Sequence, residues 1–152
     1  MNTDYDSLWD HVVAQFGCGR DSVHGPDHWK RVLRNGLLIA RHTSGASEEV
    51  VRLFALFHDS KRESDGTDEG HGKRGAEFAA SLRGVLFELS DVEFALLDRA
   101  CRWHTMGLLT DEPTLGSCWD ADRLDLARVG IRPMLEWLLP FPLTIGRQVG
   151  SI

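Results

Sequence analysis

The chain has 152 residues, of which 42% are apolar and 26% charged, a size and composition ordinary for one soluble domain with a single core. Its formal net charge of -6 leaves no basic surplus to neutralise phosphates, which argues against broad binding to polymeric nucleic acid. No apolar stretch approaches the roughly 20 residues of a membrane-spanning helix, and the acidic N-terminus has no signal-peptide pattern. We therefore expect a cytoplasmic protein in which residues 1–152 form one domain.

Helical spacing dominates the first half of the chain. A first helix is predicted over about residues 4–16, where a Gly-Cys-Gly sequence ends it. The next helix is expected to begin at Pro26, because the first turn needs no N–H from that residue, and to run to about His42. A third helix is expected after Ser47, whose hydroxyl can cap it. Its inward positions follow the i, i+3, i+4, i+7 pattern and end in a histidine: Val51, Phe54, Ala55 and His58.

The second half continues this pattern with two longer loops. A glycine-rich loop over residues 64–72 precedes a helix from about Gly72 to Leu82, with an extension to Leu89 left open. Ser90 begins the next helix with a capping box. A loop over residues 105–116 then leads to a helix from about Ser117 to Val129. With a short helix over residues 132–139 and an irregular tail after Pro140, the sequence predicts an all-α bundle of six or seven helices.

Histidines and aspartates occupy inward positions on three of these helices. His58 and Asp59 are adjacent where the third helix ends, and His28 lies near the start of the second. Asp122 shares a predicted helical face with apolar residues, where a carboxylate is unfavourable unless it is paired or metal-bound. Neighbouring helical side chains point roughly 100° apart, so His58 and Asp59 can share an ion only in a cleft between helices. This placement suggests a metal site.

The donor atoms indicate which metals the site would suit. Two imidazoles and two carboxylates, without a thiolate, are suited to a divalent ion such as Mn, Co, Ni, Fe, Zn or Mg. Four protein ligands on an ion that accepts six leave positions for water and substrate, as in catalytic sites. Taken singly, however, a buried histidine or aspartate is more often satisfied by an ordinary hydrogen bond.

The ordered segments HGPDHWKRV, LFHDSKRE and DADRLD resemble the HD-domain superfamily of metal-dependent phosphohydrolases over about residues 24–131. The resemblance implies an HD-type helical domain and four metal ligands, with Asp120 as the reserve choice for the fourth. These ligands are His28, His58, Asp59 and Asp122. Extra histidines in the most similar subgroup match His24, His71 and His104.

One position departs from the pattern of some phosphohydrolases in this superfamily. They carry a glutamate three residues after the HD aspartate, where it acts on the nucleophilic water. Arg62 stands at that position here, and Glu63 follows it. The sequence leaves open whether Glu63 takes this role, whether Asp59 does, or whether the chemistry differs.

Cations and histidines next to the ligands supply the remaining candidates. Arginine binds phosphate through two N–H groups and lysine as a point charge, so a cluster of both fits a phosphorylated substrate. The predicted substrate-binding residues are Lys61, Arg62, Arg74, Arg123 and His24. The predicted catalytic residues are Asp59, Lys61, His71 and His104. The two histidines could orient substrate, protonate the leaving group or, with Asp59 as a bridge, hold a second ion. Asp125 is expected only to pair with Arg123 or Arg128.

The resulting hypothesis is a phosphohydrolase that uses metal-activated water to cleave a small phosphorylated metabolite, such as a nucleotide or another phosphomonoester or diester. Two alternatives stay open. Some HD-fold proteins are di-iron oxygenases, and a non-catalytic domain could retain the fold to sense a metal or nucleotide. The expected partner is a small phosphorylated substrate, with neither polymeric nucleic acid nor membrane. The sequence does not indicate the oligomeric state.

Overall fold

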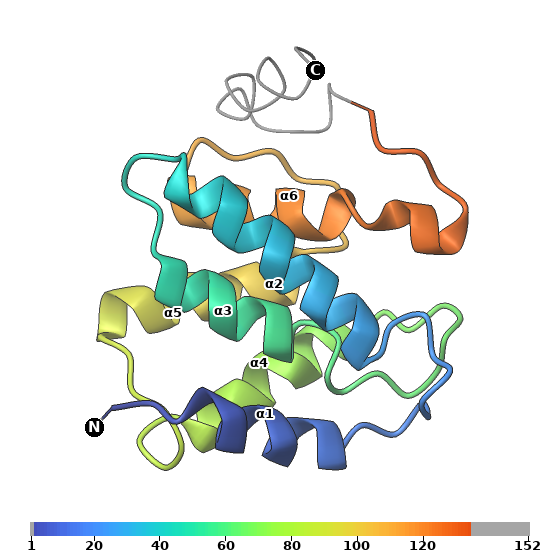
Figure 1. Cartoon of the computed structure of the whole chain (residues 1–152), viewed down its shortest axis with the longest axis horizontal. Helices are drawn as coiled ribbons and strands as arrows, with labels where there is room; N and C mark the ends of the chain where they lie inside the picture. The colour runs from blue at the N-terminus through green and yellow to red at the C-terminus, as the bar shows by residue number, and fades with distance from the viewer. Residues whose placement is uncertain (1, 135–152) are drawn as a thin grey trace.

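A computed structural model describes residues 2–134, in which all regular elements are helical (Figure 1). The elements in chain order are α1 (Tyr5–Ala14), α2 (Pro26–Arg41), α3 (Glu48–Phe57), α4 (His71–Leu82), α5 (Asp91–Trp103), α6 (Pro113–Arg123) and the 3-10 turn η1 (Leu126–Val129). Figure 1 shows α1 and α4 at one end of the molecule and α6 at the other, with α3 and α5 between them and α2 running from the middle of the molecule to the level of α6. The predicted all-α fold is confirmed, and none of the described helices combines the length and apolarity needed to cross a membrane.

The predicted helix starts are explained by local capping. The Ser47 hydroxyl accepts a hydrogen bond from the Val50 N–H at 3.3 Å, and Pro26 occupies the first turn of α2. Ser90 accepts from the Glu93 N–H at 3.3 Å while its own hydroxyl donates to the Glu93 carboxylate at 2.9 Å. These contacts join residues at most three positions apart, so they can be predicted from the sequence alone.

The last predicted helices differ from the observed ones. The helix predicted over Ser117–Val129 begins earlier, because Pro113 fits its first turn and the Glu112 carboxylate accepts from the Leu115 N–H at 2.6 Å. It also ends at Arg123, and a separate 3-10 turn follows. The extension of α4 to Leu89 is wrong, since Gly84 turns the chain with φ +78°. Residues 131–134 are not helical, and the remainder of the helix predicted over 132–139 lies outside the described residues, as does the predicted tail.

The third helix, α3, forms the centre of the core. Seven of its ten residues are buried, and it packs against α2, α5 and α6 as well as α1 and α4. These buried residues are Val50, Val51, Leu53, Phe54, Ala55, Leu56 and Phe57. Because α3 is enclosed on most sides, the residues that follow it, His58 and Asp59, are held in the interior of the bundle.

Two glycines let α4 approach its neighbours at backbone distance. A Cβ atom at Gly72 would lie 2.4 Å from the Cys101 carbonyl oxygen near the end of α5. A Cβ atom at Gly75 would lie 2.4 Å from the carbonyl oxygen of Phe57, the last residue of α3. Only glycine permits these two approaches without a shift of the backbone, and they place the start of α4 beside the ends of both helices.

The close approach at Gly75 can be tested by adding one methyl group. Gly75→Ala is expected to lower the free energy of unfolding by about 1–3 kcal/mol, because the new Cβ meets a rigid carbonyl rather than a flexible side chain. Urea denaturation followed by circular dichroism measures this change. Gly17→Ala is the control, since nothing lies within 4 Å of a Cβ there. Equal stability of the two variants would show that α4 is not held at backbone distance.

Candidate metal centre

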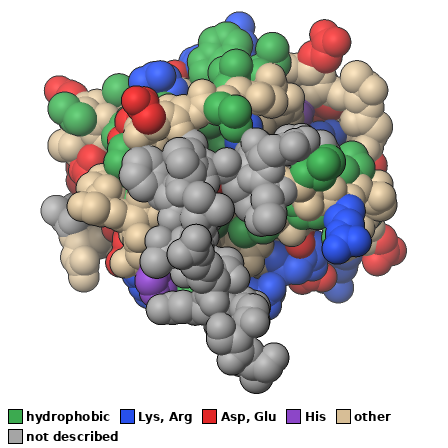
Figure 2. Space-filling model, turned by 90° about the horizontal axis from the view of Figure 1, so that it is seen from above, with side chains coloured by type: hydrophobic (Ala, Val, Ile, Leu, Met, Phe, Trp, Pro, Cys, Tyr) green, Lys and Arg blue, Asp and Glu red, His purple; other side chains and the backbone are tan. Residues whose placement is uncertain are grey.

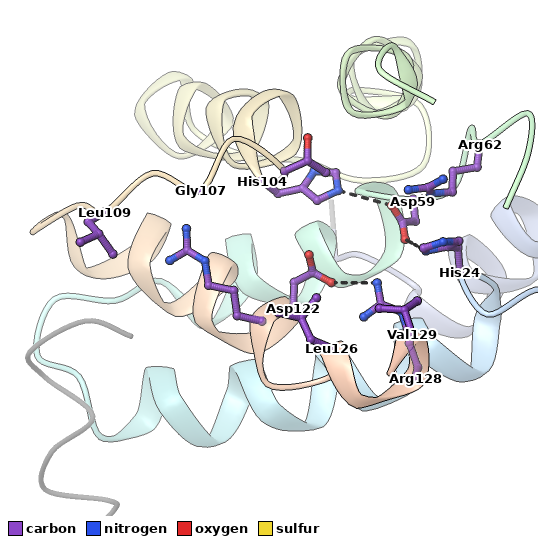
Figure 3. Close-up of a pocket in the computed structure, with 12 residues that line it drawn as sticks. His24, Asp59, Arg62, His104, Gly107, Leu109, Asp122, Leu126, Arg128 and Val129 are labelled. Atoms are coloured by element: carbon purple, nitrogen blue, oxygen red, sulfur yellow. Dashed lines mark hydrogen bonds and ion pairs between the residues drawn. The ribbon is translucent and has the colours of Figure 1, made fainter. Parts of the chain in front are cut away.

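Six buried histidines and aspartates meet where five helices begin or end (Figure 3 shows part of this region). His58 and Asp59 follow α3, and His104 follows α5. His71 begins α4, while His28 lies in the first turn of α2 and Asp122 near the end of α6. All six have at most 9% of their surface exposed.

The four ligands that the sequence predicts are brought together. The Nε2 atoms of His28 and His58 lie 3.0 Å apart. Asp122 Oδ1 is 3.2 Å from His28 Nε2 and 3.7 Å from His58 Nε2. Asp59 Oδ2 is 3.5 Å and 3.7 Å from the same two nitrogens. Four donor atoms from three regions of the chain therefore face one point.

A second cluster lies on the other side of Asp59. The Nε2 atoms of His71 and His104 are 3.0 Å apart, and Asp59 Oδ1 lies 3.2 Å and 3.4 Å from them. The donor atoms of Asp59, His71 and His104 all lie within 4.8 Å of one another, and the same holds for His28, His58 and Asp59. Asp59 thus presents one oxygen to each cluster, as a bridging carboxylate does.

The opposite nitrogen of each imidazole identifies its tautomer. Each Nδ1 faces an oxygen that can only accept, so Nδ1 carries a hydrogen, and in the neutral ring Nε2 presents its lone pair. His28 Nδ1 donates to Asp125 Oδ2 at 2.7 Å, and His104 Nδ1 donates to the Cys101 carbonyl at 2.7 Å. His58 Nδ1 faces the Phe54 and Ala55 carbonyls at 3.1 Å, and His71 Nδ1 donates to the Asp68 carbonyl.

These residues fit a divalent cation. Two lone pairs that face each other at 3.0 Å repel unless a positive charge lies between them. Asp59 Oδ2 and Asp122 Oδ1 are buried and have no hydrogen-bond partner. Buried oxygens of this kind are normally satisfied by a donor or a cation, and nitrogen and oxygen donors without thiolate suit first-row divalent metals and Mg.

The charge states follow from burial and from mutual contact. Burial lowers the pKa of His58 to about 3, so this ring is neutral at physiological pH. Burial alone would raise the pKa of Asp59, but the surrounding histidines, His58 foremost, hold it well below its usual range. The pKa of Asp122 is also lowered despite burial, chiefly by His28. Two carboxylates are therefore charged in the cluster, while His58 supplies a neutral nitrogen, the form that binds metals.

Asp125 is a functional candidate that the sequence did not indicate. It was expected to pair with Arg123 or Arg128, but its carboxylate accepts from His28 Nδ1 at 2.7 Å and from Arg31 Nε at 2.8 Å. Arg128 reaches only its backbone carbonyl, at 2.9 Å. Helix α6 ends at Arg123, and the chain then turns and brings Asp125 to α2. No local sequence pattern predicts this turn. Asp125 fixes the orientation of the His28 ring.

A cavity of about 460 Å³ opens beside the cluster (Figure 3). Its polar lining includes Asp59, Asp122 and His104, and its cations are Arg62, Arg123 and Arg128. His24 also lines it and places Nδ1 3.3 Å from Asp59 Oδ2. The structure thus brings three of the predicted substrate-binding residues, His24, Arg62 and Arg123, to the cluster. The remaining lining residues are Thr105, Gly107, Leu109, Leu126 and Val129.

Two predicted residues lie elsewhere. Lys61 Nζ donates to Gln15 at 3.1 Å and lies 4.0 Å from the centre of the Phe78 ring, because the turn after Asp59 directs it toward α1 and α4. Arg74 is bound to the Asp68 carboxylate at 2.6 Å. Both line a separate hollow rather than the cavity, so the predicted roles of Lys61 in catalysis and of Lys61 and Arg74 in substrate binding are not supported by their positions.

The geometry bears on two questions that the sequence leaves open: whether Glu63 acts on the water, and which aspartate is the fourth ligand. Glu63 has a side chain that is 76% exposed and faces Arg74 at 3.6 Å, so it does not reach the cluster. Arg62 instead places Nε 3.4 Å from Asp59 Oδ1. Asp120, the reserve ligand, faces Arg123 at 3.6 Å, whereas Asp122 faces the two histidines. The geometry favours Asp122 as the fourth ligand.

The surface of the molecule above α6 carries side chains of both charges and apolar side chains (Figure 2). Figure 2 shows acidic, basic and hydrophobic side chains interspersed over the described part of this face. The predicted absence of polymeric nucleic acid as a partner stays a prediction.

The lowered pKa of His58 predicts how stability depends on pH once metal has been removed. An unfolded chain protonates this ring below about pH 6.5 and the folded protein does not until about pH 3, so stability falls as pH falls through that interval. The raised pKa of His104 acts above this interval, and the lowered pKa values of Asp59 and Asp122 act below 3.8. We expect a loss of about 1 kcal/mol from His58 between pH 6 and 5.

Urea denaturation of EDTA-treated protein at pH 6.0 and 5.0, below the range in which His104 acts, measures this loss. His58→Leu should reduce the pH dependence, whereas His42→Leu, at an exposed position, should leave it unchanged. A wild-type stability equal at both pH values would contradict the assigned state of His58.

Comparison with known proteins was made by sequence and by structure. No protein-family model matches the chain, and no curated protein sequence does so. Among solved structures, the chain resembles a crystal structure described as a predicted HD superfamily hydrolase from an uncultured Thermotogales bacterium. The TM-score is 0.63 at 28% identity, over 82% of this chain and 72% of that one. The resemblance that the three sequence motifs indicate is therefore confirmed, and the chain has the HD-domain fold.

Proposed function

We propose that the protein is a metal-dependent hydrolase and that its substrate is a phosphate ester of a small metabolite, with nucleotides among the candidates. The observation that carries the proposal is the convergence of imidazole nitrogens and unsatisfied carboxylate oxygens beside a cavity lined by arginines. The likeness to a predicted HD superfamily hydrolase supports the hydrolase part. The phosphate part rests on the cations of the cavity.

The proposed ion would be held by His28, His58, Asp59 and Asp122. His71 and His104, with the second oxygen of Asp59, would hold another. A bound divalent ion supplies Lewis-acid activation of water and polarisation of a phosphoryl oxygen. Where two ions bind, a single bridging carboxylate keeps them close together, which is the arrangement that phosphate-cleaving sites with two metals use.

The chain's own residues would bind and orient the substrate. The guanidinium groups of Arg62, in the loop after α3, of Arg123, on α6, and of Arg128, on η1, line the cavity, where they can hold phosphoryl oxygens. His24 has a buried Nδ1 without a hydrogen-bond partner, which can position a polar substrate atom next to Asp59. Burial of the cluster restricts water to the side that faces the cavity.

A di-iron oxygenase is the second candidate, favoured by the pair of clusters that share Asp59. The arginine lining indicates an anionic substrate, which fits the proposed phosphate ester. Elemental analysis of protein purified in air, with an oxygen-uptake assay, separates these functions. Two irons and oxygen consumption would support the oxygenase and contradict hydrolysis as the main activity.

Hydrolysis of p-nitrophenyl phosphate and of nucleoside monophosphates, with added Mn, Co, Ni or Mg, tests the proposed function. The wild type should show turnover that EDTA abolishes. Asp59→Asn should lower the rate at least about 100-fold, because it removes the charge shared by both clusters. Asp91→Asn, which removes a carboxylate with a 97% exposed side chain at the start of α5, is the control. Undiminished turnover by Asp59→Asn would refute the assigned centre.

The role of Asp125 can be measured without turnover. Asp125→Ala should weaken Mn binding about 10–100-fold, because the His28 ring loses the acceptor that fixes its tautomer and orientation. Isothermal titration calorimetry gives this affinity. Asp98→Ala is a matched control, since Asp98 also pairs with an arginine, at 2.8 Å, but lies outside both clusters. An unchanged affinity in Asp125→Ala would mean that His28 needs no such support.

A further inference from the structure

Arg128 is a buried cation that the proposed ion binding does not use. Its side chain is 9% exposed and lines the cavity from η1. Nη1 donates to the Asp125 carbonyl at 2.9 Å, which fixes the guanidinium plane. Nη2 lies 3.5 Å from Asp122 Oδ1, and Nε is buried without a hydrogen-bond partner. We infer that Arg128 binds a terminal phosphoryl group and that the cavity selects phosphomonoesters over phosphodiesters, an inference that rests on the proposed function.

The unsatisfied Nε of Arg128 points to an anionic ligand. A buried N–H without an acceptor is unfavourable, and a ligand oxygen in the cavity would satisfy it. Nε and Nη2 form one edge of the guanidinium plane, the edge on which two parallel N–H groups can bind two oxygens of one phosphate. Because the Asp125 carbonyl holds the other side of the group, this edge is already oriented before a ligand arrives.

The charge of the cavity favours a dianion. Its lining contains three guanidinium groups and two carboxylates, so it carries an excess of one positive charge before any ion binds, and a divalent ion increases that excess. A phosphomonoester carries close to two negative charges at pH 7, because its second pKa is about 6. A diester carries one. The monoester is therefore the better match to the charge that Arg62, Arg123 and Arg128 present.

The apolar side chains of the lining favour a substrate with a single organic group. The apolar side chains among the described lining residues belong to Leu109, Leu126 and Val129, the last two on η1. A monoester places its phosphate among the cations and its organic part against these side chains. A diester carries an organic group on two of its oxygens and would bring one of them toward the charged residues. We therefore expect an apolar or aromatic organic part next to a terminal phosphate.

Two probes with the same leaving group test this selection: p-nitrophenyl phosphate and bis(p-nitrophenyl) phosphate, with Mn present. The wild type should have a kcat/KM for the monoester at least about 10-fold above that for the diester. Arg128→Met keeps the length of the side chain without its charge, and should lower the monoester value about 100-fold and the diester value much less. Arg128→Lys keeps the charge without the two-pronged edge and should lower the monoester value about 10-fold. Arg83→Met is the control, because Arg83 pairs with Asp91 and does not line the cavity.

Ligand binding distinguishes phosphate contact from a structural role. Calorimetry with inorganic phosphate should show weaker binding to Arg128→Met than to the wild type, while Mn affinity stays within about threefold. A loss of Mn affinity would place Arg128 in support of Asp122 and overturn the inference. So would equal losses for both esters, or a wild type that prefers the diester, although the proposed function would then stand. If the wild type hydrolyses neither ester with any metal, the proposed function fails and the inference fails with it.

Discussion

Asp59 is a buried carboxylate with imidazole nitrogens on both of its sides, and the arrangement of the bundle follows from keeping it there. One of its oxygens faces His28 and His58, and the other faces His71 and His104. A charge in the interior is unfavourable unless a donor, a counter-charge or a metal ion stabilises it. The four histidines lie in or directly beside α2, α3, α4 and α5, so these helices must meet at one place. The glycines of α4 make that meeting possible at backbone distance.

Helix ends supply much of the orientation within the clusters. The last carbonyls of a helix have no partner within it, and side chains that follow can donate to them. His58 and His104 are the residues directly after α3 and α5, and their Nδ1 atoms face the carbonyls of Ala55 and Cys101. The carbonyls at these two helix ends thus orient the rings of His58 and His104 so that their Nε2 atoms face the clusters. Asp125 does the same for His28 from a distant part of the chain.

Helix caps and inward helix positions depend on near neighbours in the sequence and can be predicted from it. The direction of a side chain that follows a turn depends on distant contacts and cannot. Caps such as Ser47 and Ser90, and the inward positions of His58 and Asp122, follow from spacing within one helix. Lys61 is two residues from Asp59 but faces away from the clusters, toward Gln15 after α1 and Phe78 on α4. The break after Arg123 is likewise stabilised by contacts with α2, so the roles of the residues beyond it could not be predicted from a helical pattern.

The identity of the residue three positions after Asp59 affects the chemistry of the whole cavity. A glutamate at that position would add a negative charge and an acceptor for water. Arg62 adds a positive charge, contacts Asp59 at 3.4 Å and is held by the Ser64 and Gly66 carbonyls at 3.1 Å. Glu63 does not restore the acceptor, since it faces solvent and Arg74. The exchange of a glutamate for Arg62 moves the cavity by two charge units toward positive, which favours an anionic substrate.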